Sequence, residues 1–377
     1  MNGRIQVVDM ARPRVKPELS PYVTVDRAVR IGATVYGLGI EIDDPDGRIK
    51  ALVGALDGTR SPAEVISAVS ADHADASPRE IADAMQQLLD AGLLEDYGAP
   101  VPVELTDRER DRYSRGVPFF RWMDRVPRAN SWDIQIGLRR SRVLLIGLGG
   151  VGGAVAQGLV ASGVGFLHCV DADFVEVSNL NRQILYREAD IGRSKIDAAM
   201  EHLRDLNSDV EISGEQLRIT SEADLGALLE PGYDVVALCA DKPRVIRRWA
   251  NRAFHQAGVT WAVGGYHGPI ASVGVHGPET GACWECLHDQ AADIPDMRMP
   301  PGMSIEDLDP RLPWNPVNIV SAAITGSFVT HFVLAVLTGA PPIEVGFCYE
   351  VNLAVPGESN LVRLGRRAEC PICGDRS

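Results

Sequence analysis

A glycine-rich loop constrains this 377-residue chain more than any other feature of its sequence. The apolar run Arg142–Ile146 leads directly into Gly147, Gly149, Gly150 and Gly152, and a helical pattern follows. Glycine lets the backbone approach a phosphate, and the N-terminus of the next helix offers unpaired N–H groups. A strand, a G-x-G-x-x-G loop and a helix in this order therefore predict a nucleotide site.

Short apolar runs alternate with helical patterns through the rest of the chain. We expect strands over residues 142–146, 166–171, 210–215, 234–239 and 259–263. Such alternation predicts an α/β fold, a doubly wound, Rossmann-like and mostly parallel sheet. In such folds an acidic residue about 20 positions after the glycine loop binds a ribose hydroxyl. Asp171 and Asp173 occupy that place in the sequence.

The residues after this acidic strand end favour ATP over a dinucleotide. Asn179, Arg182 and Gln183 come next, and Lys195 then begins a helix. A reaction at the α-phosphate of ATP moves negative charge onto phosphate oxygens, and fixed cations stabilise that charge. Asp241 ends the fourth strand, where a carboxylate faces the ligand crevice and can bind Mg²⁺. An NAD oxidoreductase remains an alternative, which nicotinamide binding without ATP binding would support.

Two C-x-x-C pairs account for four of the seven cysteines. Cys283 and Cys286 form the first pair, and Cys370 and Cys373 form the second. Four thiolates fill every position of a tetrahedral Zn²⁺ site, so we expect a structural zinc. The pairs lie too far apart for a local zinc ribbon. The zinc would therefore clip the C-terminal tail to the body of the domain.

Net charge and hydropathy limit the classes of binding partner and the cellular compartments that we expect for this protein. The formal net charge of −14 argues against nucleic acid and anionic membranes as partners. Residues 319–340 are apolar and long enough to span a bilayer, but their serines, threonines and histidine favour a buried or dimer-facing helix. The N-terminus shows no secretory pattern, so we expect a cytoplasmic protein.

The first hundred residues differ in character from the rest of the chain. Residues 34–42 suggest a short strand pair, and residues 43–47 suggest a hairpin turn. Helical patterns follow over residues 49–56, 63–69 and 78–89, and the last two begin with Ser-Pro. We expect a small α+β, winged-helix-like domain over residues 1–100. Residues 101–140 would be a linker and a helical arm, and residues 141–377 the nucleotide domain.

Taken together, these motifs resemble the ThiF/MoeB family, bacterial relatives of ubiquitin-activating enzymes. The likeness runs from about Arg112 to the C-terminus. It rests on the glycine loop of residues 147–152, Asp171 to Asp173, residues 178–183, Lys195, residues 239–241 and the four paired cysteines. The stretch Arg112-Tyr113-Ser114-Arg115 is similar to the family's R-Y-x-R element.

The resemblance implies roles for the site residues. Asp173 would bind the ribose, and Asp241 would work with Mg²⁺. Asn179, Arg182, Gln183 and Lys195 would hold the phosphates. Arg115 would reach into the partner subunit's ATP site, which implies a homodimer.

The implied reaction is ATP-dependent adenylation of a peptide or protein C-terminal carboxylate, which gives an acyl-adenylate and pyrophosphate. Many relatives carry a reactive cysteine in the segment after the first C-x-x-C pair. Residues 288–315 contain no cysteine, so we expect no thioester step.

The first hundred residues resemble the PqqD-like recognition element of enzymes that modify ribosomal peptides. That likeness favours a role in maturing a ribosomally synthesised peptide whose leader this domain binds. Two alternatives stay open: activation of a ubiquitin-like sulfur carrier, and a non-catalytic, leader-binding partner of a cyclodehydratase.

Overall fold

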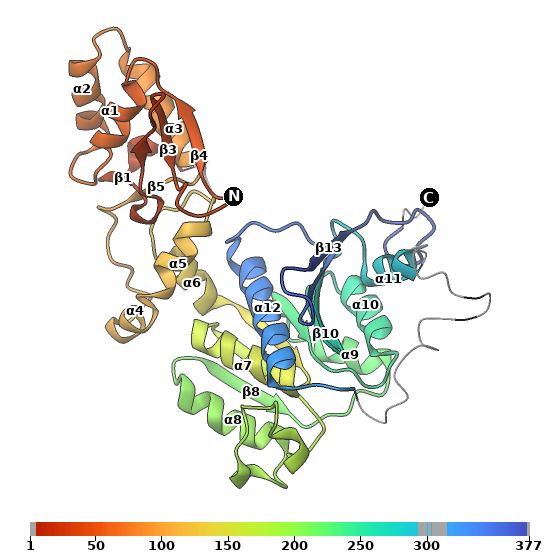
Figure 1. The fold of residues 1–377 in the computed structure, drawn as a ribbon. Coiled ribbons are helices and arrows are strands. Elements are labelled where there is room, and N and C mark those ends of the chain that lie inside the picture. The colour runs from red at the N-terminus through yellow and green to blue at the C-terminus, as the bar shows by residue number, and fades with distance from the viewer. Residues whose placement is uncertain (1–4, 293–299, 301–302, 304–314, 375–377) are drawn as a thin grey trace. The chain divides into compact units, whose positions relative to one another are not determined.

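The computed structural model describes residues 5–292, 300, 303 and 315–374. It divides into two compact units, one of Met1–Gly137 with Thr338–Pro342 and one of Leu138–Leu337 with Ile343–Ser377 (Figure 1). The first unit takes in residues 101–137 of the segment 101–140 that we expected to form a linker and an arm. Each unit has its own sheets and its own core.

The described part of the first unit contains short strands and the α-helices α1 to α6, the last of which extends beyond it. Its elements are β1 (Pro13–Val15), β2 (Tyr22–Val23), β3 (Ala28–Ile31), β4 (Ile40–Asp43), α1 (Arg48–Ala55), α2 (Pro62–Asp72), α3 (Pro78–Asp90), β5 (Leu94–Asp96), α4 (Asp107–Tyr113), α5 (Gly116–Met123) and α6 (Asp133–Arg140). Strands β2, β3 and β4 form an antiparallel sheet, and β1 pairs with β5. The unit is therefore α+β; its likeness to a winged helix stays a prediction.

Helix starts in this unit follow from local side-chain chemistry. Ser61 and Ser77 cap α2 and α3, each with proline at the first helical position and a glutamate three residues on. The serine hydroxyl accepts from the glutamate N–H, and the glutamate carboxylate accepts from the serine N–H. Both capping boxes satisfy N–H groups that a helix start leaves unpaired, which is why Ser-Pro predicted these starts correctly.

The predicted strand pair over residues 34–42 was wrong. Residues 34–39 form turns, and only β4 is a strand, whose partner is β3. The predicted hairpin turn at residues 43–47 was also wrong, because this segment leads into α1. The buried Asp44 carboxylate accepts from the N–H groups of Ile49 and Lys50 at 2.9 Å each, and so fixes the first turn of that helix.

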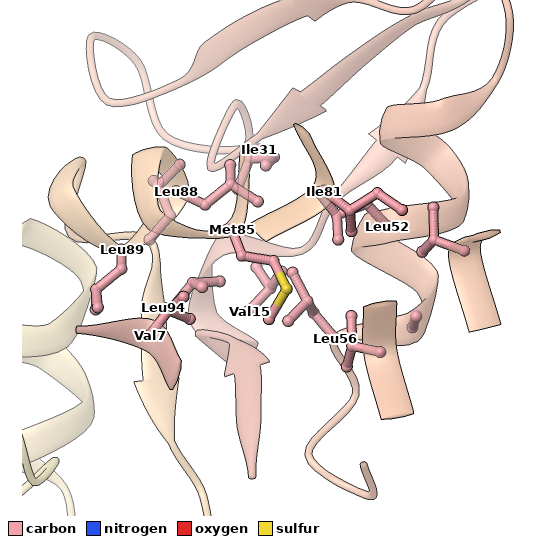
Figure 2. Packing of buried hydrophobic residues seen from close by; sticks show 14 of the residues in the cluster. Val7, Val15, Ile31, Leu52, Leu56, Ile81, Met85, Leu88, Leu89 and Leu94 are labelled. Carbon is pink, nitrogen blue, oxygen red and sulfur yellow. The ribbon is translucent and has the colours of Figure 1, made fainter. Parts of the chain in front are cut away.

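The core of the first unit lies between its helices and its small sheets. Met85 and Leu89 of α3 are fully buried against Leu94 of β5 and Ile31 of β3 (Figure 2). These positions lie four residues apart on α3, so they share one face of the helix. Burial of this apolar face is what orders so small a domain.

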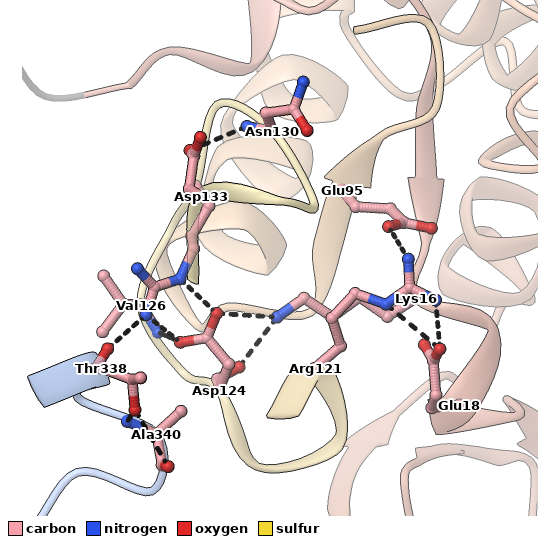
Figure 3. A network of polar contacts seen from close by, with 11 residues as sticks. Lys16, Glu18, Glu95, Arg121, Asp124, Val126, Asn130, Asp133, Thr338 and Ala340 are labelled. Atoms are coloured by element: carbon pink, nitrogen blue, oxygen red, sulfur yellow. Dashed lines mark hydrogen bonds and ion pairs between the residues drawn. The ribbon is translucent and has the colours of Figure 1, made fainter. Parts of the chain in front are cut away.

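A buried polar network lies beside this core (Figure 3). Lys16 Nζ donates to the Asp124 carbonyl at 2.8 Å, and Arg128 makes two bonds to the Asp124 carboxylate. Arg128 also donates to the carbonyl of Thr338 at 2.6 Å. Burial lowers the pKa of Lys16 to about 8, although Asp124 opposes that effect. Thr338 belongs to the first unit, so this network connects two distant parts of the sequence within that unit.

The second unit contains an eight-stranded sheet and the helices that cover it. Its elements are β6 (Arg142–Ile146), α7 (Gly150–Ser162), β7 (Phe166–Val170), α8 (Lys195–Leu206), β8 (Glu211–Glu215), α9 (Glu222–Leu228), β9 (Val235–Leu238), α10 (Ile246–Gln256), β10 (Thr260–His267), β11 (Ile270–His276), α11 (Trp284–Ala292), α12 (Ile319–Thr338), β12 (Phe347–Asn352) and β13 (Ser359–Arg363). The strand order is β13-β12-β11-β10-β9-β6-β7-β8.

Strands β8, β7, β6, β9 and β10 are parallel, and β11, β12 and β13 extend the sheet as antiparallel strands. The predicted Rossmann-like, mostly parallel sheet is confirmed. The chain moves from β6 outward through β7 and β8, then returns to β9 on the other side of β6. The crevice between β6 and β9 is the topological switch point where such sheets bind ligands.

Helix α12 is the apolar segment that we expected to be buried or dimer-facing. It is long and apolar enough to cross a membrane, but it packs on the sheet and on α7. A Cβ at Gly264 of β10 would meet Val329 at 2.6 Å, and a Cβ at Gly158 of α7 would meet Thr330 at 2.7 Å. Figure 1 shows α12 beside α7. Packing within the second unit therefore buries part of this apolar helix, and a dimer contact of the remainder stays a prediction.

Candidate active site

The glycine loop has the tight geometry that its sequence predicts. Gly147 has φ +94°, and a Cβ there would come 2.7 Å from the backbone nitrogen of Ala240. A Cβ at Gly152 would come 1.8 Å from the carbonyl oxygen of Gly147. At Gly149, by contrast, a Cβ would meet nothing within 4 Å. Gly147 and Gly152 therefore permit the tight turn, and Gly149 leaves open space at the N-terminus of α7.

Asp171 holds this loop from the neighbouring strand. Its carboxylate accepts from the Leu148 N–H at 2.6 Å and from the Asp173 N–H at 2.8 Å. The buried Tyr186 hydroxyl donates to the Leu148 carbonyl at 3.0 Å. Both carboxylate oxygens of Asp171 are therefore engaged inside the protein, so its role here is to position the loop.

Asp173 carries an exposed carboxylate of the site. Lys195 Nζ lies 3.3 Å from one of its oxygens, and an Arg218 nitrogen lies 3.3 Å from the other. The Lys195 side chain is 7% exposed and that of Asp173 is 56% exposed, so a buried cation supports an accessible carboxylate. Sequence reasoning missed Arg218, because it follows β8 in a stretch without a motif.

Arg182 belongs to a short segment between β7 and α8. It donates to the Ser178 carbonyl at 2.8 Å and to the Asn181 side chain at 3.0 Å, and its charge acts on Tyr266 of β10. Asn179 and Gln183 are buried in the same segment. The Asn179 side chain accepts from the Glu176 N–H at 3.1 Å, and so caps the 3₁₀ turn Val177–Asn179.

The Gln183 side chain is buried, and its amide oxygen has no hydrogen-bond partner among the described residues. A buried acceptor without a partner is costly, so it marks a position where a ligand group can complete the site.

Asp241 lies at the carboxyl end of β9, as the sequence predicted, and its side chain is exposed. Burial raises the pKa of Tyr266, Arg182 opposes that shift, and the charge of Asp241 adds to it. Burial lowers the pKa of Arg247, and Asp241 opposes that shift. The charge of Asp241 therefore acts on both Tyr266 and Arg247, which places these two side chains near it. Neither residue belongs to a sequence motif that we used.

These side chains fit a nucleoside triphosphate. The loop gives N–H groups and open space at Gly149, and Arg182 and Lys195 supply positive charge at the carboxyl ends of parallel strands. The exposed Asp241 carboxylate has the oxygen chemistry that Mg²⁺ prefers. Arg115 is exposed at the start of α5 in the first unit, and its contact with a partner subunit stays a prediction.

The four paired cysteines form one buried cluster, as predicted. Their ligand atoms all lie within 4.8 Å of one another; Cys283 and Cys370 sulfurs are 3.8 Å apart, and Cys286 and Cys373 sulfurs are 3.5 Å apart. Zn–S bonds of about 2.3 Å place tetrahedral sulfurs about 3.8 Å apart. The donor set and its spacing therefore fit Zn²⁺.

The cysteine cluster is connected to α10. The buried Asn251 donates to Cys283 Sγ at 3.5 Å and accepts from the Trp284 N–H at 3.1 Å. The segment that we expected to lack a thioester cysteine falls mostly on residues 293–314, nearly all of which lie outside the described part of the chain. The absence of a thioester step stays a prediction.

Comparison with known proteins places this architecture in a family. The model of the ThiF family matches residues 124–371. The sulfur carrier protein adenylyltransferase of Thermus thermophilus is 32% identical over 275 residues, which is 72% of this chain and 93% of the relative.

Two crystal structures of Escherichia coli MccB have the same fold over both units. One has a TM-score of 0.76 at 20% identity and covers 97% of each chain. The other, with AMPCPP and MccA, has a TM-score of 0.71 at 20% identity and covers 96% of this chain and 99% of MccB. The prediction of an enzyme that adenylates its substrate is confirmed by the family match and the similar relatives. This chain belongs to the ThiF family and is an adenylyltransferase.

Proposed function

We propose that this enzyme uses ATP and Mg²⁺ to adenylate the C-terminal carboxylate of a peptide, in the maturation of a ribosomally synthesised modified peptide. One observation carries the proposal. Arg182, Lys195 and Asp241 converge at the carboxyl ends of parallel strands around an open glycine loop, at the switch point of the sheet. A protein that only binds peptides has no use for such a set.

The residues of the site divide the work of the reaction. The glycine loop and Asp173 hold the nucleotide, and Arg182 and Lys195 stabilise negative charge that develops on the phosphates. Mg²⁺ held by Asp241 would neutralise phosphate oxygens. A substrate carboxylate oxygen attacks the α-phosphorus and forms a new P–O bond, while the bond to the β-phosphate breaks and pyrophosphate leaves. The carboxylate is already ionised at neutral pH, so no general base is needed.

Lys195 would change partners during this cycle. Its ammonium lies 3.3 Å from the Asp173 carboxylate, the partner that it would leave. A ribose hydroxyl that donates to Asp173 would leave the ammonium free to meet a phosphate. Arg218, 3.3 Å from the other Asp173 oxygen, would remain as its partner.

A peptide substrate is favoured over a sulfur carrier by the first unit. The fold of MccB, which was crystallised with MccA, matches 96% of this chain, whereas the alignment to the sulfur carrier enzyme covers 72% of it. We propose that residues 1–100 form a winged-helix-like, PqqD-like domain that binds a leader segment. Sulfur-carrier activation is the second candidate, because that relative matches 72% of this chain at 32% identity.

Three further features complete the proposal. The enzyme works in the cytoplasm as a homodimer, in which Arg115 of one subunit reaches the ATP site of the other. The four cysteines hold a structural Zn²⁺. A leader-binding partner of a cyclodehydratase is disfavoured, because such a scaffold needs neither Lys195 nor Asp241.

Hydroxylamine trapping tests the proposed reaction. The enzyme, ATP and Mg²⁺ are incubated with peptides and ubiquitin-like proteins encoded near its gene, and hydroxylamine is added to capture any acyl-adenylate. We expect a hydroxamate at the C-terminus of a peptide, detected by mass spectrometry. A hydroxamate only on a ubiquitin-like protein would favour the second candidate, and none on either would contradict adenylation.

A further inference from the structure

Arg247 is a cation of the site that the proposed nucleotide chemistry does not use. It lies in the first turn of α10, and its side chain passes over β10. A Cβ at Gly265 would come 2.6 Å from an Arg247 guanidinium nitrogen, so the absence of a side chain at residue 265 makes room for the guanidinium. Cys348 of β12 and Asp241 are the charged or ionisable neighbours that influence it.

The guanidinium of Arg247 has no acceptor of its own. Among the described residues it makes no hydrogen bond and no ion pair, and Asp241 acts on it only through its charge. The other arginines near the site differ, because Arg182 and Arg218 have partners at 2.8 Å and 3.3 Å. A partly buried guanidinium with five N–H donors and no acceptor is prepared for an anion.

The strand order places this cation beside the nucleotide site. The glycine loop follows β6, Asp241 follows the adjacent strand β9, and Arg247 lies over Gly265 near the end of the next strand, β10. Arg182 and Lys195 follow β7 in the chain. The charges of Arg182 and Asp241 both act on Tyr266 of β10, the residue after Gly265. An anion at Arg247 would therefore lie beside the groups that we assign to the phosphates and to Mg²⁺.

Helix α10 holds Arg247 at a fixed place. Asn251 lies one turn further along the same helix face, where it bonds the sulfur of Cys283 and the N–H of Trp284. The zinc cluster thus anchors the helix through Asn251, and the guanidinium is presented at the site by a fixed element.

We propose that Arg247 binds the C-terminal carboxylate of the substrate and orients it toward the α-phosphorus. This inference rests on the proposed function and assigns the residue that selects a free carboxylate. A guanidinium binds a carboxylate through two parallel hydrogen bonds, which a neutral carboxamide cannot match. One oxygen then stays near the guanidinium while the other attacks.

Affinity selection from paired peptide libraries tests the assignment. One library of N-acetylated tetrapeptides ends in free carboxylates, and the other ends in carboxamides. Both are offered together to the zinc-loaded enzyme with AMPCPP and Mg²⁺, and bound peptides are counted by mass spectrometry. We expect the wild type to prefer free carboxylates by about 100-fold, the scale of a bidentate ion pair.

The variants R247M and R247K separate positioning from folding. We expect R247M to lose the preference for carboxylates and R247K to keep a small part of it, with AMPCPP affinity within about twofold of the wild type. R248M is the matched control, because Arg248 is the exposed neighbour on the same helix, and it should keep the full preference.

Two outcomes would overturn the assignment: equal binding of both libraries by the wild type, or an R247M variant that still prefers carboxylates. A carboxylate preference that depends on Arg247, without any hydroxamate in the trapping experiment, would instead contradict the proposed function alone.

Discussion

Lys195 Nζ lies 3.3 Å from Asp173 Oδ2, and the lysine is buried while the aspartate is exposed. This pair puts a fixed positive charge beneath the carboxylate that we assign to the ribose. Burial restricts the conformations of the Lys195 side chain, so the ammonium is already in position when the phosphates bind. Preorganised charge of this kind stabilises a transition state without a cost of reorganisation.

Removing this cation should therefore slow the reaction more than it weakens the fold. For Lys195→Met, which keeps the aliphatic stem, we expect the rate of pyrophosphate exchange to fall about 10²–10³-fold. Lys195→Arg keeps the charge and should retain more activity than Lys195→Met. Steady-state exchange kinetics and thermal melting of each variant check this; unchanged exchange in Lys195→Met would contradict a phosphate role.

Two glycines of the loop should respond differently to the same added methyl group. Gly152→Ala forces a Cβ to within 1.8 Å of the Gly147 carbonyl, so we expect a destabilised loop and a lower melting temperature. Gly149→Ala meets no protein atom within 4 Å, so stability should be kept while ATP affinity falls, because the methyl group occupies the ligand's space. Calorimetry and ATP titration separate the two effects. Equal loss of stability in both variants would contradict the geometry.

The cysteine cluster should carry one zinc ion per chain. We expect Cys373→Ser to lower the zinc content and the melting temperature, because the ion clips the C-terminal segment to α11. Cys348→Ser is the matched control, since Cys348 lies outside the cluster, and its zinc content should be unchanged. Metal analysis of the purified proteins gives the answer. Full zinc content in Cys373→Ser would contradict a four-cysteine site.

His276 should make the second unit less stable in acid. The ring is fully buried against Trp261, and burial lowers the pKa of His276 from 6.5 to about 4. Between pH 6.5 and 4 the unfolded chain binds a proton that the folded unit does not bind. Stability from this residue is therefore complete above pH 6.5 and is lost as the pH falls toward 4.

The variant His276→Leu isolates this effect from the titration of other groups. Between pH 6.5 and 4 the free energy of unfolding of the wild type falls because His276 must stay neutral in the fold. In His276→Leu this fall should be smaller by up to about 3 kcal/mol. Calorimetric melts at several pH values measure the difference. Parallel pH profiles for the two proteins would show that the ring is not buried in its neutral form.

The motif residues could be predicted because their chemistry is local. Apolar runs place the starts and ends of β6 to β10 to within a few residues, and Ser-Pro pairs start α2 and α3 through hydrogen bonds within one turn. The glycine loop and the paired cysteines can also be recognised from the spacing of their residues in the sequence.

The remaining site residues could not be found in this way. Arg218, Tyr266 and Arg247 belong to three different strand ends or helices, and only the sheet order brings them to one crevice. Residues 34–39 combine β-branched and aromatic side chains with glycines, and the glycines decide the outcome: Gly37 has φ +79°, which a strand does not allow. Antiparallel strands β11 to β13 carry no alternation strong enough to separate them from loops.

The most direct test of the account is substrate-dependent ATP–pyrophosphate exchange by the zinc-loaded enzyme. Adenylation is reversible before the product leaves, so labelled pyrophosphate enters ATP only when a carboxylate has been activated. We predict exchange that requires a peptide with a free C-terminus and Mg²⁺ and that falls about 10²-fold or more in Lys195→Met. A folded, zinc-loaded enzyme that binds peptide and ATP but gives no exchange would contradict adenylation by this site.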